Sequence, residues 1–436
     1  MTKIPSNPIF DIDNDIASAS LPNKGHPTFF VPSFNSMPNQ QEHPKSQRNI
    51  ISLMAETSST NSIKIGTKMF STQFVLIFSL FLSLPILFLL APRIFPSHNP
   101  SIPISPSDEL EDFVLFRKAT ASASASAAHY PSAHSHLTSK SKKLKIAFLF
   151  LTNTDLFFAP LWEQFFKSAD KNLFNIYVHA DPHSNVTKPT GIFFSQFIPD
   201  AKRTYRASPT LISATRRLLA NAILDDPANT FFAVLSQYCI PLHSFKYVYN
   251  SLISSKSFDL SSPESDPEST QYNMKIQYKS FIEIISKDRR LWKRYVSRGK
   301  YAMMPEVPFE KFRAGSQFFV LTRRHALMVI EDRMLWNKFK LPCYREDECF
   351  PEEHYFPTLL SMQDPDGCTK YTLTKVNWTG TRNGHPYTYK AAEISPVLIQ
   401  ELRQSNYSSS YLFARKFEPI CLNPLMKIAD KVIFRD

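Results

Sequence analysis

The chain has 436 residues, enough for one large domain or two ordinary ones, and its 43% hydrophobic residues, with 37 Phe, can supply a sizeable core. It has 8 Gly against 33 Pro, and neither the dinucleotide fingerprint nor the phosphate-binding P-loop is present, so a bound nucleotide needs another mode of recognition. A formal net charge of +12 favours an acidic partner, a class that includes nucleic acid, an anionic membrane and an acidic substrate.

The first predicted element is a transmembrane helix over residues 69–92, "MFSTQFVLIFSLFLSLPILFLLAP", a run without a charged residue. A bilayer core about 30 Å thick needs roughly 20 apolar residues, so this run is long enough to span it. It is too long, and starts too far from Met1, for a cleavable signal peptide, which predicts a signal anchor. A buried core helix is the alternative. Residues 1–68 are rich in Pro, Ser and Asn without periodicity, which predicts a disordered tail.

The charges around this run predict its orientation. Arg48, Lys64 and Lys68 lie on its amino side, whereas Arg93 stands alone close to its carboxyl side. The positive-inside rule therefore places residues 1–68 in the cytosol and the rest of the chain in a lumenal or extracellular compartment. Nucleic acid is a poor candidate partner there.

Two features beyond the run are compatible with a lumenal location. Glycosylation sequons begin at Asn185, Asn377 and Asn406. All five cysteines also lie beyond the run, in a compartment where disulfides can form. Cys343 and Cys349 are spaced to close a short loop, but the sequence by itself leaves the pairing open.

Residues 93–143 are predicted to form a flexible stem. They include the low-complexity run "ATASASASAAHYPSAHSH", whose small side chains cannot bury a core. An ordered lumenal domain is expected over residues 144–436, where short apolar runs and helical patterns begin.

Strands and helices alternate through the first half of this domain. The expected elements are a strand over 145–152, a helix over about 160–169, a strand over 174–181, a helix over 208–226, a strand over 231–237 and a helix from about Ser244. Ser208 followed by Pro209 is a typical helix start. This alternation predicts an α/β domain with a mainly parallel sheet.

The ends of the predicted strands suggest where a ligand binds. In open α/β sheets ligands lie beyond the carboxyl ends of the strands, so we expect Thr152, Asp181 and Ser236–Gln237 to lie close together. Further along, residues 261–270, "SSPESDPEST", are predicted to form an acidic surface loop. The segment 316–336 changes from strand to helix near Arg323.

Nine stretches from residue 145 on resemble the core-2/I-branching β-1,6-N-acetylglucosaminyltransferase family (glycosyltransferase family 14), especially its plant branch. In chain order they are "KIAFLFLT", "APLWEQFF", "IYVHADP", "RRLLANAILDD", "VLSQYCIPL", "FRAGSQFFVLTRRHA", "PEEHYFPT", "VNWTG" and "FARKF". The resemblance implies an A-type nucleotide-sugar glycosyltransferase fold, a mainly parallel mixed sheet flanked by helices. It also implies inverting transfer from a UDP-sugar to a glycan hydroxyl with neither metal nor other cofactor, and a type II membrane topology.

The motif "PEEHYFPT" carries the predicted catalytic base. An inverting transfer needs one base to remove the proton of the attacking hydroxyl, and the second acidic residue, Glu353, matches the family's base. Adjacent residues of a helix point about 100° apart, so Glu352 is expected to be a neighbour rather than a partner in catalysis. The alternative is that acids after Pro351 only stabilise a helix N-terminus. His354 is expected to be packed or hydrogen-bonded.

The remaining site residues are also implied by the resemblance. Lys416 in "FARKF" matches the lysine that binds the diphosphate, with a solvated strand-end cation as the alternative, and Arg403 is the nearest match to the family's upstream arginine. Asp181 matches a position near the nucleotide base and ribose, but it equally fits a turn before Pro182. The residues that match the acceptor side are Ser316, Gln317, Trp378 and the segment 291–295, "LWKRY". A core Trp and a solvated basic helix face are the alternatives for the last two.

These predictions combine into a single-pass type II Golgi membrane glycosyltransferase with a lumenal catalytic domain. It is expected to transfer GlcNAc or glucuronic acid from a UDP-sugar to a hydroxyl of a galactose-containing glycan or glycoprotein. The alternative from a different class is a catalytically silent glycan-binding membrane protein with the same fold.

Overall fold

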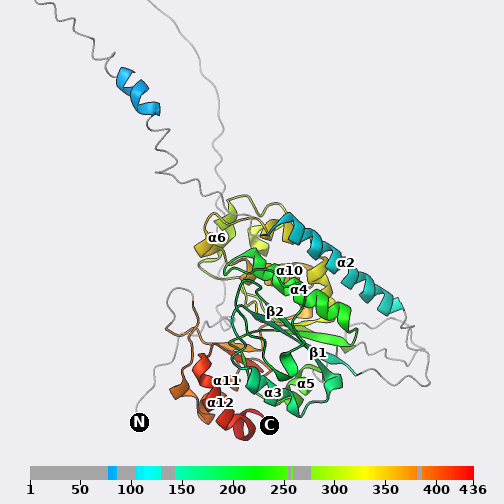
Figure 1. Cartoon of the computed structure of the whole chain (residues 1–436). Helices are drawn as coiled ribbons and strands as arrows, with labels where there is room; N and C mark the ends of the chain where they lie inside the picture. Colours follow the sequence, from blue (N-terminus) through cyan, green and yellow to red (C-terminus); the bar gives the residue numbers. More distant parts are fainter. Residues whose placement is uncertain (1–76, 86–103, 129–142, 254–256, 259–275, 381–384) are drawn as a thin grey trace, which may run out of the picture. The chain divides into compact units, whose positions relative to one another are not determined.

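The computed structural model describes residues 77–85, 104–128, 143–253, 257–258, 276–380 and 385–436 (Figure 1). Residues 77–85 form a helix, and the rest of the predicted membrane span lies outside the described residues, as do the tail 1–68 and the acidic loop 261–270. No helix within the described ranges is long and apolar enough to cross a membrane.

A six-stranded mixed sheet forms the centre of the domain, in the order β2-β1-β3-β8-β7-β9. The three parallel strands at one side are β1 (Lys145–Thr152), β2 (Phe174–Ala180) and β3 (Asn229–Ser236). The strands that complete it are β8 (Val320–Thr322), antiparallel to β3, β7 (Ser280–Glu283), antiparallel to β8, and β9 (Cys368–Lys370), parallel to β7. The predicted α/β class and its three leading strands are confirmed.

The strand β1 is buried from residue 146 to residue 152, and residues 146–151 are all apolar, because helices cover both faces of the sheet. Ala147, Leu149 and Leu151 belong to one buried cluster, while Ile146, Phe148 and Phe150 alternate into the other. The helices of the first layer include α4 (Pro209–Asp225), α7 (Arg323–Glu331), α8 (Met334–Phe339) and α10 (Tyr355–Gln363). Those of the second are α3 (Ala159–Lys167), α5 (Phe245–Ile253), α11 (Pro396–Arg403) and α12 (Leu422–Ile428) (Figure 1).

Local sequence signals set several helix ends. The Ser208 side chain accepts a hydrogen bond from the Thr210 amide at the start of α4, as predicted. The switch from strand to helix also falls where the sequence predicts it, because β8 ends at Thr322 and α7 begins at Arg323. A second sheet consists of β10 (Thr374–Val376), β11 (Phe413–Arg415) and β4 (Ile240–Pro241), and β5 (Ser257–Phe258) pairs with β6 (Ile276–Gln277).

The predicted flexible stem is wrong for residues 106–128, which form the helix α2 (Pro106–Ala128) against α4 (Figure 1). Ser105 accepts a hydrogen bond from the Asp108 amide at the helix start, and Ala119 is fully buried. Asp112 is also buried and forms an ion pair with Arg217 of α4. The small residues that argued for a stem include several alanines, which favour helix once a neighbouring helix covers one side.

Candidate functional site

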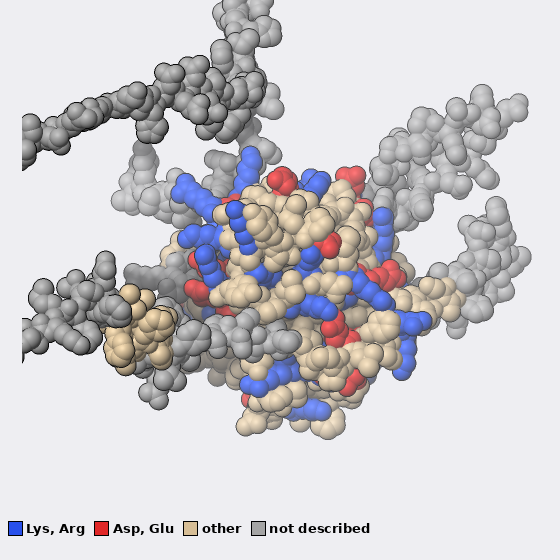
Figure 2. Space-filling view, turned by 90° about the horizontal axis from the view of Figure 1, so that it is seen from above, with Lys and Arg blue, Asp and Glu red and all other residues tan. Residues whose placement is uncertain are grey.

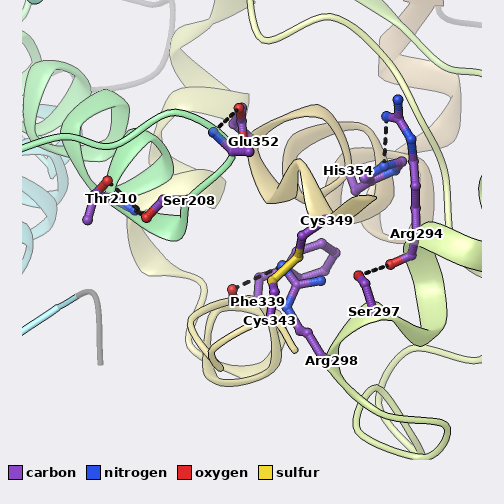
Figure 3. The surroundings of a disulfide bond; sticks show 11 residues. Ser208, Thr210, Arg294, Ser297, Arg298, Phe339, Cys343, Cys349, Glu352 and His354 are labelled. Carbon is purple, nitrogen blue, oxygen red and sulfur yellow. Dashed lines mark hydrogen bonds between the residues drawn. A yellow bond between two sulfur atoms is a disulfide. The ribbon is translucent and has the colours of Figure 1, made fainter. Parts of the chain in front are cut away.

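The two glutamates of "PEEHYF" lie in a short 3-10 helix, Pro351–Glu353, just before α10, and have different surroundings. The Glu353 side chain is 31% exposed, and its Oε2 lies 2.5 Å from Nη1 of Arg294, a residue of α6 (Leu291–Tyr295). Glu352 is 3% exposed and points toward the loop that precedes α4 (Figure 3). Only Glu353 is therefore open to a substrate.

Glu352 is a buried acid without a charged partner in contact. Its Oε1 accepts a hydrogen bond from the Ala207 amide at 3.2 Å, while its Oε2 has no hydrogen-bond partner. Burial, and then the charge of Glu353, raise the pKa of Glu352 to about 8. At neutral pH this carboxyl is therefore mostly protonated.

Arg294 connects Glu353 with His354. Nδ1 of His354 lies 2.8 Å from the carbonyl oxygen of Arg313, so it donates, and Nε2 accepts from Nη1 of Arg294 at 3.3 Å. His354 is fully buried and stacks on Phe312, and burial followed by the charge of Arg294 lowers the pKa of His354 to about 3. His354 is thus a packed, hydrogen-bonded residue, as predicted, and it helps to orient Arg294.

Glu283, which sequence reasoning did not single out, lies close to Glu353. Burial, and then the charge of Glu353, raise the pKa of Glu283, although the Ser316 amide donates a hydrogen bond to it. The backbone at Gly315 passes close to the backbone of Glu283. Only glycine fits there, because a Cβ at position 315 would lie 2.0 Å from the carbonyl oxygen of Glu283. The sequence shows a glycine in "FRAGSQFF", but not the carbonyl oxygen that it packs against.

Ser316 and Gln317 follow Gly315 into the same region. The Ser316 hydroxyl accepts a hydrogen bond from the Phe318 amide, whereas Oε1 of Gln317 is buried without a partner among the described residues. An unpaired buried amide oxygen is costly unless a ligand or water satisfies it. Gln317 is therefore the better placed of the two for binding.

Lys416 lies directly after β11, with its Nζ 4.5 Å from the centre of the Tyr238 ring. Burial, and then the charges of Arg415 and Arg206, lower the pKa of Lys416. The Arg415 guanidinium stacks 4.2 Å from the Phe318 ring centre, and its Nε has no hydrogen-bond partner. Nη1 of Arg206 lies 2.9 Å from Nε2 of His385.

These three cations lack a compensating acid. In the part of the chain that the structure describes, no carboxylate forms an ion pair with Arg206, Arg415 or Lys416. Burial lowers the pKa of Arg415, while Cys239 and then Glu353 oppose that shift. Arg415 thus joins the cations and Glu353 in one electrostatic neighbourhood, suited to a base at one end and an anion at the other.

The predicted meeting of strand ends is confirmed. The Asp181 amide donates to the carbonyl oxygen of Thr152 at 3.0 Å, and Nε2 of Gln237 donates to Oδ1 of Asn153 at 2.8 Å. The Asp181 carboxylate accepts hydrogen bonds from the amides of His183 and Thr204 and from the Thr204 hydroxyl. Burial disfavours its ionisation, but these bonds outweigh burial and hold the pKa of Asp181 below its usual value. This geometry favours the turn-forming role.

Arg403 is engaged in the fold. Its guanidinium donates to the carbonyl oxygens of Leu242, Val432 and Ile433 and lies 3.5 Å from Asp436. These contacts tie α11 to the C-terminus, and within the described residues they set Arg403 apart from Lys416, Arg415 and Arg206, which form no ion pair with a carboxylate. The expected diphosphate role of Arg403 is therefore not supported by its surroundings.

Trp378 is 54% exposed in the loop after β10, which excludes the core alternative. Because Val376 of β10 pairs with Arg415 of β11, this loop leaves the second sheet at the end where Lys416 lies. Among the sequon asparagines, Asn185 and Asn406 are exposed and Asn377 is half-buried, with its Oδ1 accepting from the Thr379 amide. Within the described residues, no group of three His, Cys, Asp or Glu side chains is arranged to hold a metal ion.

The charges on the surface are interspersed. Figure 2 shows Lys and Arg side chains mixed with Asp and Glu on the face seen from above. The net positive charge is thus not gathered there in one uninterrupted patch.

Comparison with known proteins identifies the class. The model of the family "Branch: Core-2/I-Branching enzyme" matches residues 146–403, more than half of the chain. The chain therefore belongs to the Core-2/I-branching enzyme family of glycosyltransferases, as predicted from the nine stretches. Glu353, Asp181 and Trp378 lie within the matched residues, whereas Lys416 lies beyond them.

A plant protein is similar to this chain over part of the length of both proteins. "Glycosyltransferase BC10" of Oryza sativa subsp. japonica is 28% identical over 286 residues, which cover 58% of this chain and 64% of the relative. The chain thus matches less than two thirds of that protein.

Proposed function

We propose that this chain is an inverting glycosyltransferase of the A-type fold that uses a UDP-sugar and needs no metal ion. It transfers GlcNAc or glucuronic acid to a hydroxyl of a galactose-containing glycan, as a type II protein of the Golgi membrane with its domain in the lumen. The observation that carries the proposal is that Arg294, which pairs with Glu353, and Arg206, which has no ion pair among the described residues, lie over the same Phe350 ring, 4.9 and 5.7 Å from its centre. A base and an anion site are thereby combined.

The roles follow from the charges. The Glu353 carboxylate, held by Arg294, takes the proton of the acceptor hydroxyl. The hydroxyl oxygen then forms a bond to C1 of the donor sugar, while the bond from C1 to the phosphate oxygen breaks on the opposite face, which inverts the configuration. UDP leaves with the bonding electron pair, and Lys416 with Arg415 stabilises the negative charge that develops on the diphosphate.

The alternative is a glycan-binding protein that has the fold without catalysis. It requires neither an ionised carboxylate at the acceptor nor cations without acidic partners. Glu353 and Lys416 both favour the enzyme.

The test measures UDP release by the detergent-solubilised full-length chain with a panel of UDP-sugars and galactose-containing acceptors. We expect Glu353→Gln to lower kcat by roughly 10²–10⁴-fold, because a general base contributes about that much. The matched control is Glu401→Gln on the exposed side of α11, which should leave kcat unchanged.

Two further measurements complete the test. Wild-type activity should persist in EDTA, and Lys416→Ala should weaken UDP binding. Glycan binding without UDP release, equal in wild type and Glu353→Gln, would establish the silent binding protein instead. A strict need for added Mn²⁺ would contradict the metal-free diphosphate site.

A further inference from the structure

A pocket lies beside α6. It has a volume of about 450 Å³. The residues that line it and matter here are Trp292, Ser297, Gly299, Lys300, Tyr344 and Arg345. Trp292 belongs to the segment 291–295, which matches the acceptor side of the family, whereas the other lining residues have no role in the transfer proposed above.

A disulfide and two backbone hydrogen bonds hold the walls of this pocket in place. Cys343 and Cys349 are joined, which confirms the pairing that the sequence allowed and closes the loop that carries Tyr344 and Arg345 (Figure 3). The amides of these two residues donate to the carbonyl oxygen of Ser297, at 2.9 and 3.4 Å. The loop that carries the side chains of Tyr344 and Arg345 is therefore held in place beside the pocket.

Gly299 supplies a turn beside this loop. Its φ of +117° lies in a region that favours glycine, and it follows the 3-10 helix Val296–Arg298. A Cβ there would lie 4.0 Å from Cε2 of Tyr344, which places the Tyr344 ring beside the glycine. The pocket is thus enclosed on this side by a tyrosine ring over backbone.

Two aromatic side chains offer exposed faces to the pocket. Trp292 packs against Tyr295 and Phe309 and is still 49% exposed, while Tyr344 is 68% exposed. A ring held from behind with one free face is suited to the apolar face of a sugar, since it supplies contact area at a low cost in conformational entropy.

The charged lining is positive. Lys300 and Arg345 line the pocket, and no carboxylate residue is among the lining residues. Arg345 makes an exposed contact of 3.4 Å with Glu348, and in the described ranges Lys300 has no ion pair with a carboxylate. Such cations bind a carboxylate or sulfate through charge-assisted hydrogen bonds.

The pocket is connected to the candidate base through α6. This helix carries Trp292 at the pocket and Arg294 at Glu353, and the Ser297 hydroxyl donates to the carbonyl oxygen of Arg294 at 2.6 Å. We propose that the pocket binds an acidic sugar residue of the acceptor glycan, away from the hydroxyl that reacts. This inference rests on the proposed function and deepens it.

The test measures equilibrium binding to the detergent-solubilised full-length chain, without donor. The probes are a β-linked galactose tetrasaccharide, the same tetrasaccharide with one terminal glucuronic acid, and tetraglutamate. We expect the acidic tetrasaccharide to bind roughly tenfold more tightly than the neutral one. Trp292→Ala should weaken binding of both glycans, whereas Lys300→Ala should remove only the preference for the acid.

The matched controls are Lys300→Arg, which keeps the charge, and Lys427→Ala on the exposed side of α12, which should leave binding unchanged. Thermal unfolding of each variant checks that it is folded. Equal affinity for the two tetrasaccharides would overturn the inference, as would tetraglutamate binding as tightly as the acidic glycan.

The outcomes separate this inference from the proposed function. UDP release that is insensitive to the acid and to Trp292→Ala would overturn the pocket alone. Preferential binding of the acidic tetrasaccharide without UDP release from any acceptor would support the pocket as a glycan site and contradict the transferase.

Discussion

At the scale of single residues, two adjacent glutamates have opposite surroundings. Glu353 is part-exposed and paired with Arg294, whereas Glu352 is buried with one oxygen unpaired. The sequence predicted Glu353 as the base through the family motif, and adjacency predicted that the two side chains diverge. Which of them faces solvent became visible only in the structure, because their partners lie in other elements.

The substitution Glu352→Gln tests the burial of this acid through the pH dependence of the free energy of unfolding. The folded chain holds the pKa of Glu352 at about 8, above its ordinary value of 4.5, so the folded state binds the proton more tightly. The contribution of this group to the free energy of unfolding therefore falls as pH rises from about 4.5 to 8. Glutamine stays neutral, so the variant should lose less stability over this range, by on the order of a few kcal/mol.

Denaturant unfolding at pH 5 and pH 8.5 measures that difference. The control is Glu346→Gln, an exposed acid of α9 (Glu346–Cys349), which should follow the wild type. If the variant at Glu352 lost as much stability as the wild type between these pH values, the carboxyl would not be buried as a neutral group.

Sequence reasoning missed Glu283 and could not find the partners of Arg294 and Arg415, for one physical reason. Arg294, Glu283 and Arg415 belong to three elements, and each is defined by its relation to Glu353. A charged residue on a short helix or at a strand end reads as solvated until its neighbours are known. The sequence features that could have pointed to this region are the "LWKRY" segment and Gly315, but the sequence does not show which residues they contact.

At the scale of elements, α2 is the main departure from the sequence prediction. Its composition of Ala and Ser indicated a stem, yet Asp112 accepts hydrogen bonds from Arg217 and from the Ser213 hydroxyl. Both ions of this pair are almost fully buried. The ion pair therefore holds α2 against α4, because removal of either partner would leave the other charge buried and unpaired.

Asp112→Asn tests the attachment of α2. The change leaves the Arg217 charge buried without an opposite charge, which should lower the free energy of unfolding by roughly 3–5 kcal/mol. Denaturant unfolding measures the loss. Glu111→Gln, which removes an exposed contact with Lys202, is the matched control and should cost about 1 kcal/mol or less. Equal effects of the two changes would contradict a buried pair.

At the scale of the whole molecule, α2 extends the folded unit toward the N-terminus. The sequence places the start of the ordered domain at residue 144, but α2 contributes Phe116 and Ala119 to the buried cluster that covers one face of the sheet. The Arg216 guanidinium also stacks 4.7 Å from the centre of the Phe116 ring. The helix therefore belongs to the domain.

Truncation tests this boundary. A fragment over residues 104–436 should unfold cooperatively, whereas one over 144–436 exposes the cluster and leaves Arg217 unpaired. We expect the shorter fragment to melt roughly 5–10 °C lower, in line with the loss of a buried ion pair. Scanning calorimetry measures both fragments, and equal melting temperatures would show that α2 adds nothing to the domain.

The sequence by itself determined the features that depend on neighbouring residues. These are the continuous apolar strands, the Ser208 cap, the change from strand to helix at Thr322 and the motifs that place the chain in its family. The membrane anchor, the Golgi location and the donor sugar stay predictions and proposals. Local patterns are sufficient for strands and caps because their hydrogen bonds and burial repeat at short spacing.

Only the tertiary structure decided which charges meet. It separated Glu353 from Glu352, engaged Arg403 in carbonyl contacts, brought Arg415 into the electrostatic range of Glu353, and docked α2 on α4. The physical reason is that burial and electrostatic pairing depend on residues that are distant in the chain. No spacing within the sequence encodes them directly.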